Sequence, residues 1–114
     1  MKESEEQKQL IQWARSKPWG FLLFHICNEN VGGYAWAVRN RQMGVRKGVP
    51  DLMLPIPMHG FHGLFIELKT DKGRLSEAQK VWIENLRSLG YRVEVCKGFV
   101  EAKDVLKEYM RCGS

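Results

Sequence analysis

The chain has 114 residues, of which 44% are hydrophobic, and its formal net charge is +5. This length and composition fit one domain, residues 1–114, with a real hydrophobic core. The basic charge favours a polyanionic partner, although charge alone does not separate DNA from RNA or from an anionic surface. No apolar run approaches the length of a membrane span, so we expect no membrane partner.

The cysteines and the N-terminus indicate a reducing compartment inside the cell. Cys27, Cys96 and Cys112 are far apart and odd in number, which argues against a disulfide framework and against a zinc site. The first six residues are polar and acidic, so we expect no signal peptide. An intracellular location follows from both observations.

Residues 3 to about 16 are predicted to form a helix, because Leu10, Ile11, Trp13 and Ala14 follow helical spacing. Glu6 lies four residues before Leu10, which puts it near the buried side of this helix. Glu3 shares that side less securely, and Glu5 faces elsewhere. Two interpretations of Glu6 remain open: it reaches toward a site on a sheet, or it only favours the helix dipole.

Residues 21–27 form a short apolar run that predicts a strand, with His25 packed or hydrogen-bonded within it, and residues 28–33 predict a loop. The following stretch, residues 34–47, interleaves aromatic and basic side chains and begins as a helix. Arginine and lysine supply phosphate contacts, and aromatic rings can stack on unpaired bases. We expect Trp36 to be buried, and we favour phosphate contact over a merely solvated basic loop for some of the basic residues: Arg39, Arg41, Arg46 and Lys47.

Two apolar runs that start at Leu52 and at Leu64 are separated by a turn rich in Gly, Pro and His, which predicts a hairpin. Alternate residues of a strand share a face, so Glu67 and Lys69 point away from the core. Asp51 starts the partner strand and can approach Glu67 across the ladder. Two carboxylates with room for solvent suit Mg²⁺ or Mn²⁺; the alternative is a surface hairpin with a Glu–Lys pair.

The last third of the chain predicts a helix, a strand and a helix. Lys72 and Arg74 lie in a polar loop, and Ser76 with Gln79 forms a capping-box pattern that opens a helix. Its apolar stripe is expected to contain Val81, Trp82, Leu86 and Leu89, and Gly90 ends it. Residues 91–96 alternate as a strand, residues 99–109 repeat as a helix, and residues 110–114 form a frayed tail.

Several motifs follow one another in a fixed order: Met43-Gly44-Val45, Gly48-Val49-Pro50-Asp51-Leu52, Phe65-Ile66-Glu67-Leu68-Lys69, Ser76 with Gln79, Gly90-Tyr91-Arg92-Val93, and Glu101-Ala102. On these residues the chain resembles the virus-type replication-repair nuclease (VRR-NUC) domain over nearly its whole length. That domain is part of the PD-(D/E)XK nuclease superfamily. The resemblance implies a restriction-endonuclease-like α/β core, a small mixed sheet flanked by helices.

The resemblance also implies an activity and a set of roles. The activity is Mg²⁺- or Mn²⁺-dependent hydrolysis of phosphodiester bonds in branched DNA. Asp51, Glu67 and the main-chain carbonyl of Ile66 are implied to hold metal, Lys69 to handle the attacking water, and Gln79 to match the helix glutamine of the family. The helix acid maps best onto Glu6. Small stand-alone members resemble Holliday-junction resolvases and act as homodimers in a bacterial cell or phage-infected host, hence in the cytoplasm.

Two other interpretations remain. In one, the same fold cuts flaps, linear duplex or RNA. In the other, the chain is a noncatalytic nucleic-acid-binding subunit with a degenerate site, and the intact set of Asp51, Glu67 and Lys69 counts against it. The basic residues that flank the acids, including Lys72 and Arg74, are expected to bind nucleic acid in either case.

Overall fold

The computed structural model of the chain describes residues 2–27 and 33–111. Its elements in chain order are α1 (Glu3–Ala14), the 3-10 helix η1 (Gly20–Leu22), β1 (Phe24–His25), α2 (Tyr34–Gln42), β2 (Leu52–Leu54), β3 (Leu64–Lys69), α3 (Glu77–Ser88), β4 (Arg92–Lys97) and α4 (Phe99–Tyr109). None of the helices in these ranges is long and apolar enough to cross a membrane.

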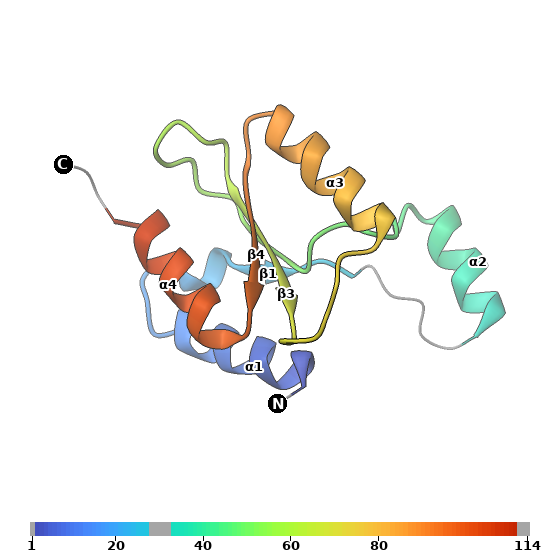
Figure 1. Cartoon of the computed structure of the whole chain (residues 1–114), viewed down its shortest axis with the longest axis horizontal. Coiled ribbons are helices and arrows are strands. Elements are labelled where there is room, and N and C mark those ends of the chain that lie inside the picture. The colour runs from blue at the N-terminus through green and yellow to red at the C-terminus, as the bar shows by residue number, and fades with distance from the viewer. Residues whose placement is uncertain (1, 28–32, 112–114) are drawn as a thin grey trace.

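The strands form one mixed sheet in the order β1-β2-β3-β4. The predicted hairpin is confirmed, since β2 and β3 are antiparallel with Leu52 opposite Ile66. β4 runs parallel to β3, and α3 makes the crossover between them. The expected α/β core with a small mixed sheet flanked by helices is therefore the observed fold (Figure 1).

β3 lies at the centre of the fold and is buried on both faces. Leu64, Ile66 and Leu68 pack into one hydrophobic cluster with residues of α1 and α4. Phe65 belongs to a second cluster with Ile83 of α3. Figure 1 shows α1 and α4 next to each other on one side of the sheet and α3 on the other. Because side chains alternate along a strand, Glu67 and Lys69 share the face that carries Phe65, toward α3.

Two predicted elements differ from the structure. The strand predicted over residues 21–27 is reduced to Phe24–His25, because the start of that apolar run forms η1 instead. On α3, Val81 and Leu89 are 55% and 64% exposed, and Ile83 is buried in their place. Both errors have one cause: neighbouring apolar residues satisfy more than one spacing, and tertiary packing decides which of them is buried.

The predicted burial of Trp36 is wrong, because its side chain is 53% exposed on α2. This helix contains no buried residue. Figure 1 shows it at the end of the long axis of the molecule, beyond the N-terminal end of α3 and away from the sheet. The aromatic and basic residues of residues 34–42 therefore face solvent instead of the core.

Candidate active site

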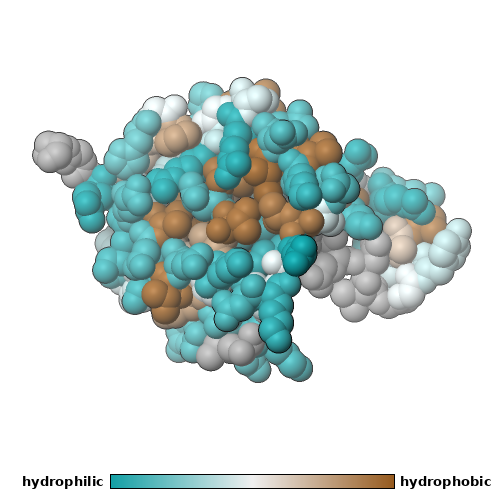
Figure 2. Space-filling model, viewed as in Figure 1, coloured by the Kyte–Doolittle hydropathy of each residue, from teal (hydrophilic) through white to brown (hydrophobic). Residues whose placement is uncertain are grey.

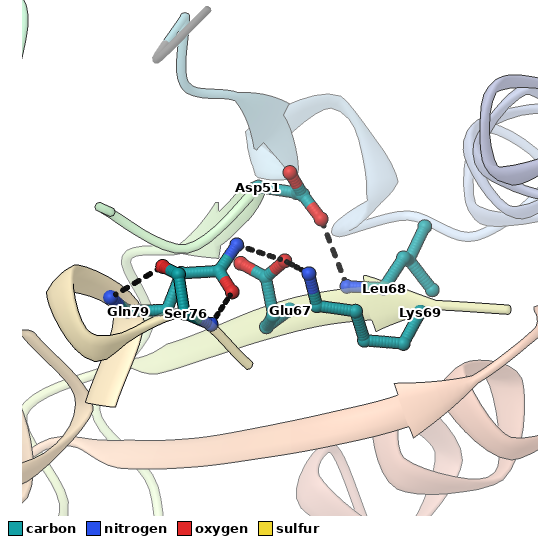
Figure 3. A network of polar contacts seen from close by, with 6 residues as sticks. All are labelled: Asp51, Glu67, Leu68, Lys69, Ser76 and Gln79. Carbon is teal, nitrogen blue, oxygen red and sulfur yellow. Dashed lines mark hydrogen bonds and ion pairs between the residues drawn. The ribbon is translucent and has the colours of Figure 1, made fainter. Parts of the chain in front are cut away.

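Asp51 and Glu67 come together because of the register of the hairpin. Leu52 pairs with Ile66 across the antiparallel ladder, so Asp51, one residue before, lies beside Glu67, one residue after. Asp51 is fixed there by a hydrogen bond in which the Leu68 N–H donates to its Oδ2 at 2.9 Å. Figure 3 shows both carboxylates over the end of β3, with Lys69 beside them.

The two oxygens of the Glu67 carboxylate have different surroundings, although the side chain is only 2% exposed. Oε2 accepts a hydrogen bond from Gln79 Nε2 at 3.2 Å and lies 3.5 Å from Lys69 Nζ. Oε1 is buried and has no hydrogen-bond partner among the described residues. A buried carboxylate oxygen without a hydrogen-bond partner costs free energy. A proton or a cation bound at this atom would therefore be stabilising.

The ionised state of both acids is disfavoured by their surroundings. Burial raises the pKa of Glu67 from its ordinary 4.5 to about 8; the charge of Asp51 adds to this effect, and Lys69 opposes it. Burial also raises the pKa of Asp51, against the Leu68 N–H, which lowers it. A cation between the two groups would reverse this effect, because it favours the charged form of both carboxyls.

Gln79 has two functions, and the first makes the second possible. Its Oε1 accepts from the Ser76 N–H at 2.8 Å, and its own N–H donates to Ser76 Oγ at 3.1 Å, which confirms the predicted capping box. Because the amide oxygen is held by Ser76, the amide nitrogen points at Glu67 (Figure 3). The helix cap thus orients a donor toward the buried acid.

These side chains line a cavity of about 340 Å³. Its walls are Asp51, Glu67, Lys69, Ser76 and Gln79, with Glu3, Lys47, Gly48 and Arg74 around them. A second cavity of about 300 Å³ is lined by Glu6, Thr70, Asp71, Lys72, Lys97, Gly98 and also Lys69. Lys69 therefore borders both cavities. Two of the predicted basic residues, Lys47 and Arg74, line the first cavity, and Lys72 lines the second.

Three predicted phosphate contacts lie elsewhere in the described structure. Arg39 and Arg41 are on α2, and Arg46 follows it in an exposed connection. Ile66 is in β3 with its side chain in the core, directly before Glu67. Lys97 was not singled out by sequence, and its only signal was its position at the end of a predicted strand.

The structure brings Glu3, and not Glu6, to the cavity that contains Asp51 and Glu67. Glu6 instead accepts a hydrogen bond from the Phe99 N–H at the start of α4. The two acids are three residues apart and therefore lie near the same side of α1, so the spacing of apolar residues did not separate them. His25 was expected to be packed or hydrogen-bonded, and its Nδ1 lies 2.9 Å from the Asp51 carbonyl oxygen.

The donor set fits a hard divalent cation. No group of three or more His, Cys, Asp or Glu side chains in residues 2–27 and 33–111 is arranged to hold a metal. Mg²⁺, however, is usually held by one or two carboxylates together with water and substrate phosphate. The unpaired Oε1 of Glu67 beside Asp51 provides such a pair, and the cavity leaves space for water.

Comparison with known proteins gives a consistent picture. The VRR-NUC domain family matches residues 1–100 of the chain. A solved structure of a VRR_NUC domain protein, 30% identical in sequence, superimposes with a TM-score of 0.86 over 100% of this chain and 92% of that one.

Curated relatives match a shorter segment. The Fanconi-associated nuclease 1 homolog of Schizosaccharomyces pombe is 51% identical over 49 residues, which are 43% of this chain and 7% of that protein. The homolog from Arabidopsis thaliana is 40% identical over 53 residues, 44% of this chain and 6% of the relative. The chain thus spans only a small part of the curated relatives that it matches.

Proposed function

Because this chain belongs to the VRR-NUC domain family of nucleases, we propose that it is a metal-dependent, structure-selective endonuclease that hydrolyses phosphodiester bonds in branched DNA. The observation that carries the proposal is the buried, unpaired Oε1 of Glu67 next to Asp51. Two acids held side by side, each with its pKa raised by burial, are costly to keep charged, and a bound cation would offset that cost.

The residues that would hold Mg²⁺ or Mn²⁺ are Asp51, Glu67 and the main-chain carbonyl of Ile66. A bound ion would activate a water molecule and offset charge on the phosphoryl group. Asp51 is oriented for this role by the Leu68 N–H, and Glu67 by Gln79 and Lys69, all through Oδ2 or Oε2. Oε1 of Glu67 stays available for the metal.

Lys69 is the residue that orients the attacking water. Its Nζ lies 3.5 Å from Glu67 Oε2, and its side chain is 12% exposed, so its position is restricted. An ammonium group held there can orient a water molecule and offset negative charge that develops on the phosphate. Gln79 acts as a positioning residue because it reaches Glu67 and is itself fixed by Ser76.

The DNA strand is expected to pass over Lys69. Lys47 and Arg74 line the cavity on one side of this residue, and Lys72 and Lys97 line the cavity on the other. Four cations along one path suit the phosphates of a single strand on either side of the scissile bond. Arg39, Arg41 and Arg46 extend this charge toward α2.

A symmetric junction requires two cuts on opposed strands, and one chain carries one such site, so we expect a homodimer. β4 lies at an edge of the sheet, and the helices on its two sides carry exposed apolar side chains: Val81 on α3, Leu89 directly after α3, and Val100 on α4. Figure 2 shows apolar residues gathered at the centre of one face, in front of β4. This face is the candidate interface.

Cleavage assays on a panel of DNA structures test the proposal. The protein, with Mg²⁺ or Mn²⁺, is incubated with four-way junctions, flaps, duplex and single strands. Asp51→Asn and Glu67→Gln should abolish cleavage of every substrate and leave binding intact. Glu84→Gln, an exposed acid on α3, is the matched control and should cleave normally. Lys69→Ala should lose about 100-fold in rate.

Each contrary result has a clear meaning. Metal-dependent activity retained in both carboxylate variants would refute the site. Wild-type protein that binds DNA but never cuts would favour the noncatalytic subunit. Activity on flaps, linear duplex or RNA without preference for junctions would leave a nuclease of this fold and remove the resolvase assignment.

A further inference from the structure

α2 has a composition and a location that the cleavage site does not explain. Tyr34 is 84% exposed and Trp36 is 53% exposed at its N-terminal end, and Arg39 and Arg41 form its last turn. None of its residues is buried. A helix of nine residues without a buried face is only marginally stable in water. The exposed aromatic rings on it therefore indicate that a binding partner covers and stabilises this helix.

The side chains of α2 fall into two stripes with the same chemistry. Trp36 and Arg39 are one turn apart, and the Arg39 guanidinium carbon lies 5.8 Å from the centroid of the Trp36 ring. Tyr34 and Arg41 are two turns apart and lie on a common side of the helix. Each stripe thus contains one aromatic ring and one arginine. In this combination the ring can stack on a base while the arginine contacts the phosphate of the same nucleotide.

Charge argues for a polyanion and against a second copy of this helix. The sequence contains no Asp or Glu between residues 30 and 50, and in this interval it contains Arg39, Arg41, Arg46 and Lys47. Two such helices side by side would bring like charges together without an apolar stripe to compensate. A nucleic-acid strand would neutralise the same charges.

The chain connects α2 directly to the cleavage cavity. Lys47 and Gly48, which follow the helix by a few residues, both line that cavity. Gly48 is pinned against the first turn of α3: an added Cβ would lie 2.7 Å from the Ala78 carbonyl carbon. The helix is therefore attached to the rim of the site at a fixed point.

We propose that α2 is an arm that binds unpaired nucleotides of branched DNA, next to the bond to be cut. Tyr34 and Trp36 stack on bases, and Arg39 and Arg41 contact the adjoining phosphates. The arm selects DNA with a single-stranded segment over continuous duplex. This inference rests on the proposed endonuclease function and names the feature of the substrate that it recognises.

Fluorescence anisotropy with labelled oligo(dT) and with blunt duplex DNA tests the arm. The double variant Tyr34→Ala, Trp36→Ala should lose about 10- to 100-fold in affinity for oligo(dT) and change about 2-fold or less on duplex. Phe21→Ala removes a 69% exposed aromatic ring from η1 and is the matched control, with wild-type binding to both. Equal losses on both DNAs, or none, would overturn the proposal.

Two further measurements separate DNA binding by the arm from a structural role of its aromatic rings and from self-association. The melting temperature of the double variant should equal that of wild type, because neither side chain is buried; a large decrease would indicate a structural role and overturn the proposal. Hydrogen exchange of residues 34–42 should slow when oligo(dT) is added. Protection that depends instead on protein concentration without DNA would assign α2 to a second copy of the chain and overturn the proposal.

The arm and the cleavage site can fail independently. Glu67→Gln should bind oligo(dT) as tightly as wild type, because it leaves α2 intact. Binding that depends on Trp36 in a protein that cuts no DNA would keep the arm and refute the endonuclease. Normal cleavage with the same flap-over-duplex preference in the double variant would keep the endonuclease and refute the arm.

Discussion

Glu67 illustrates how stability and function compete at one residue. Its carboxylate is buried next to Asp51, and one of its oxygens has no hydrogen-bond partner among the described residues. In the metal-free protein this arrangement favours a protonated Glu67. A divalent cation bound at the site would offset this cost, so the stability of the folded state and metal binding should be linked thermodynamically.

The first prediction concerns the pH dependence of stability without metal. The folded state raises the pKa of Glu67 from 4.5 to about 8, so between these values the folded protein holds a proton that the unfolded chain releases. Stability should therefore fall as pH rises from 4.5 to 8, by at most about 1.4 kcal/mol per pH unit for this proton. Urea unfolding in chelator at several pH values measures this slope.

Two comparisons make the assignment to Glu67 specific. Glu67→Gln should flatten the slope and should be more stable than wild type near pH 8 without metal. Glu84→Gln, at an exposed position, should keep the wild-type slope. Adding Mg²⁺ should increase the stability of the wild-type protein more at pH 8 than at pH 5. An unchanged slope in Glu67→Gln would show that this carboxyl is not the group that titrates.

The second prediction distinguishes the two acids of α1. Glu3 lines the cavity with Asp51 and Glu67, so Glu3→Gln should weaken metal binding and slow cleavage. Glu6 accepts the Phe99 N–H, so Glu6→Ala should cost about 1 kcal/mol of stability and leave cleavage near wild type. Metal titration and thermal melting of both variants test this prediction. Weaker metal binding in Glu6→Ala but not in Glu3→Gln would assign Glu6 to the site.

The two strand acids and Lys69 could be located from sequence because the strand period and the hairpin register are local properties. Alternation along residues 64–69 separates Glu67 from Ile66, and the turn brings Asp51 beside it. The choice between Glu3 and Glu6 could not be made in this way. It depends on how α1 is rotated against the sheet and on the start of α4, and both are set by tertiary packing.

At the scale of elements, capping chemistry was more informative than apolar spacing. The Ser76–Gln79 box and Gly90 define the two ends of α3, and both are observed. The buried side of the same helix was mispredicted at Val81 and Leu89, because only contacts with β3 and β4 select Ile83. Trp36 was mispredicted for a related reason: a large aromatic residue is usually buried, and here it lies on an unpacked helix.

The third prediction tests the point where the segment after α2 meets α3. Gly48 has a φ of +98°, and an added Cβ would also collide with the Ala78 backbone. Gly48→Ala should therefore destabilise the protein by about 3 kcal/mol or more, and should slow cleavage because Gly48 lines the cavity. Chemical denaturation and a cleavage assay measure the two effects.

Gly44 provides a matched control for this substitution. Its φ is +96°, but an added Cβ would find nothing within 4 Å. Gly44→Ala should therefore show only the backbone cost of a left-handed conformation, about 1 to 2 kcal/mol. Equal effects of the two substitutions would mean that the contact with Ala78 is unimportant for this joint.

At the scale of the molecule, charge and apolar surface lie on different elements. Basic side chains line both cavities beside Lys69 and continue along the segment to α2, where they lie next to exposed aromatic rings, whereas the exposed aliphatic side chains Val81, Leu89 and Val100 lie at α3 and α4. The proposed DNA path and the proposed contact with a second chain therefore use different surfaces, as a dimer that cuts two strands would require.

The last prediction joins assembly to salt dependence. Light scattering at micromolar concentration should give twice the 13.2 kDa of one chain, and Leu89→Asp should reduce it toward the monomer and reduce paired cutting of four-way junctions. Each chain is expected to contact phosphates through seven basic residues, the six predicted from sequence (Arg39, Arg41, Arg46, Lys47, Lys72 and Arg74) and Lys97. The logarithm of affinity should therefore fall against the logarithm of salt concentration with a slope of about −6 per chain.

Single variants show whether assembly and charge act separately. Arg74→Gln should reduce the salt slope by about 1, whereas Lys107→Gln, an exposed position on α4, should leave it unchanged. Leu89→Asp should keep the slope per chain, because the substitution removes no phosphate contact. A monomeric wild type that cuts junctions and linear duplex equally would contradict the dimer. Each site would then act alone, paired nicks would not be coordinated, and the site of one chain at Asp51 and Glu67 would account for all cleavage.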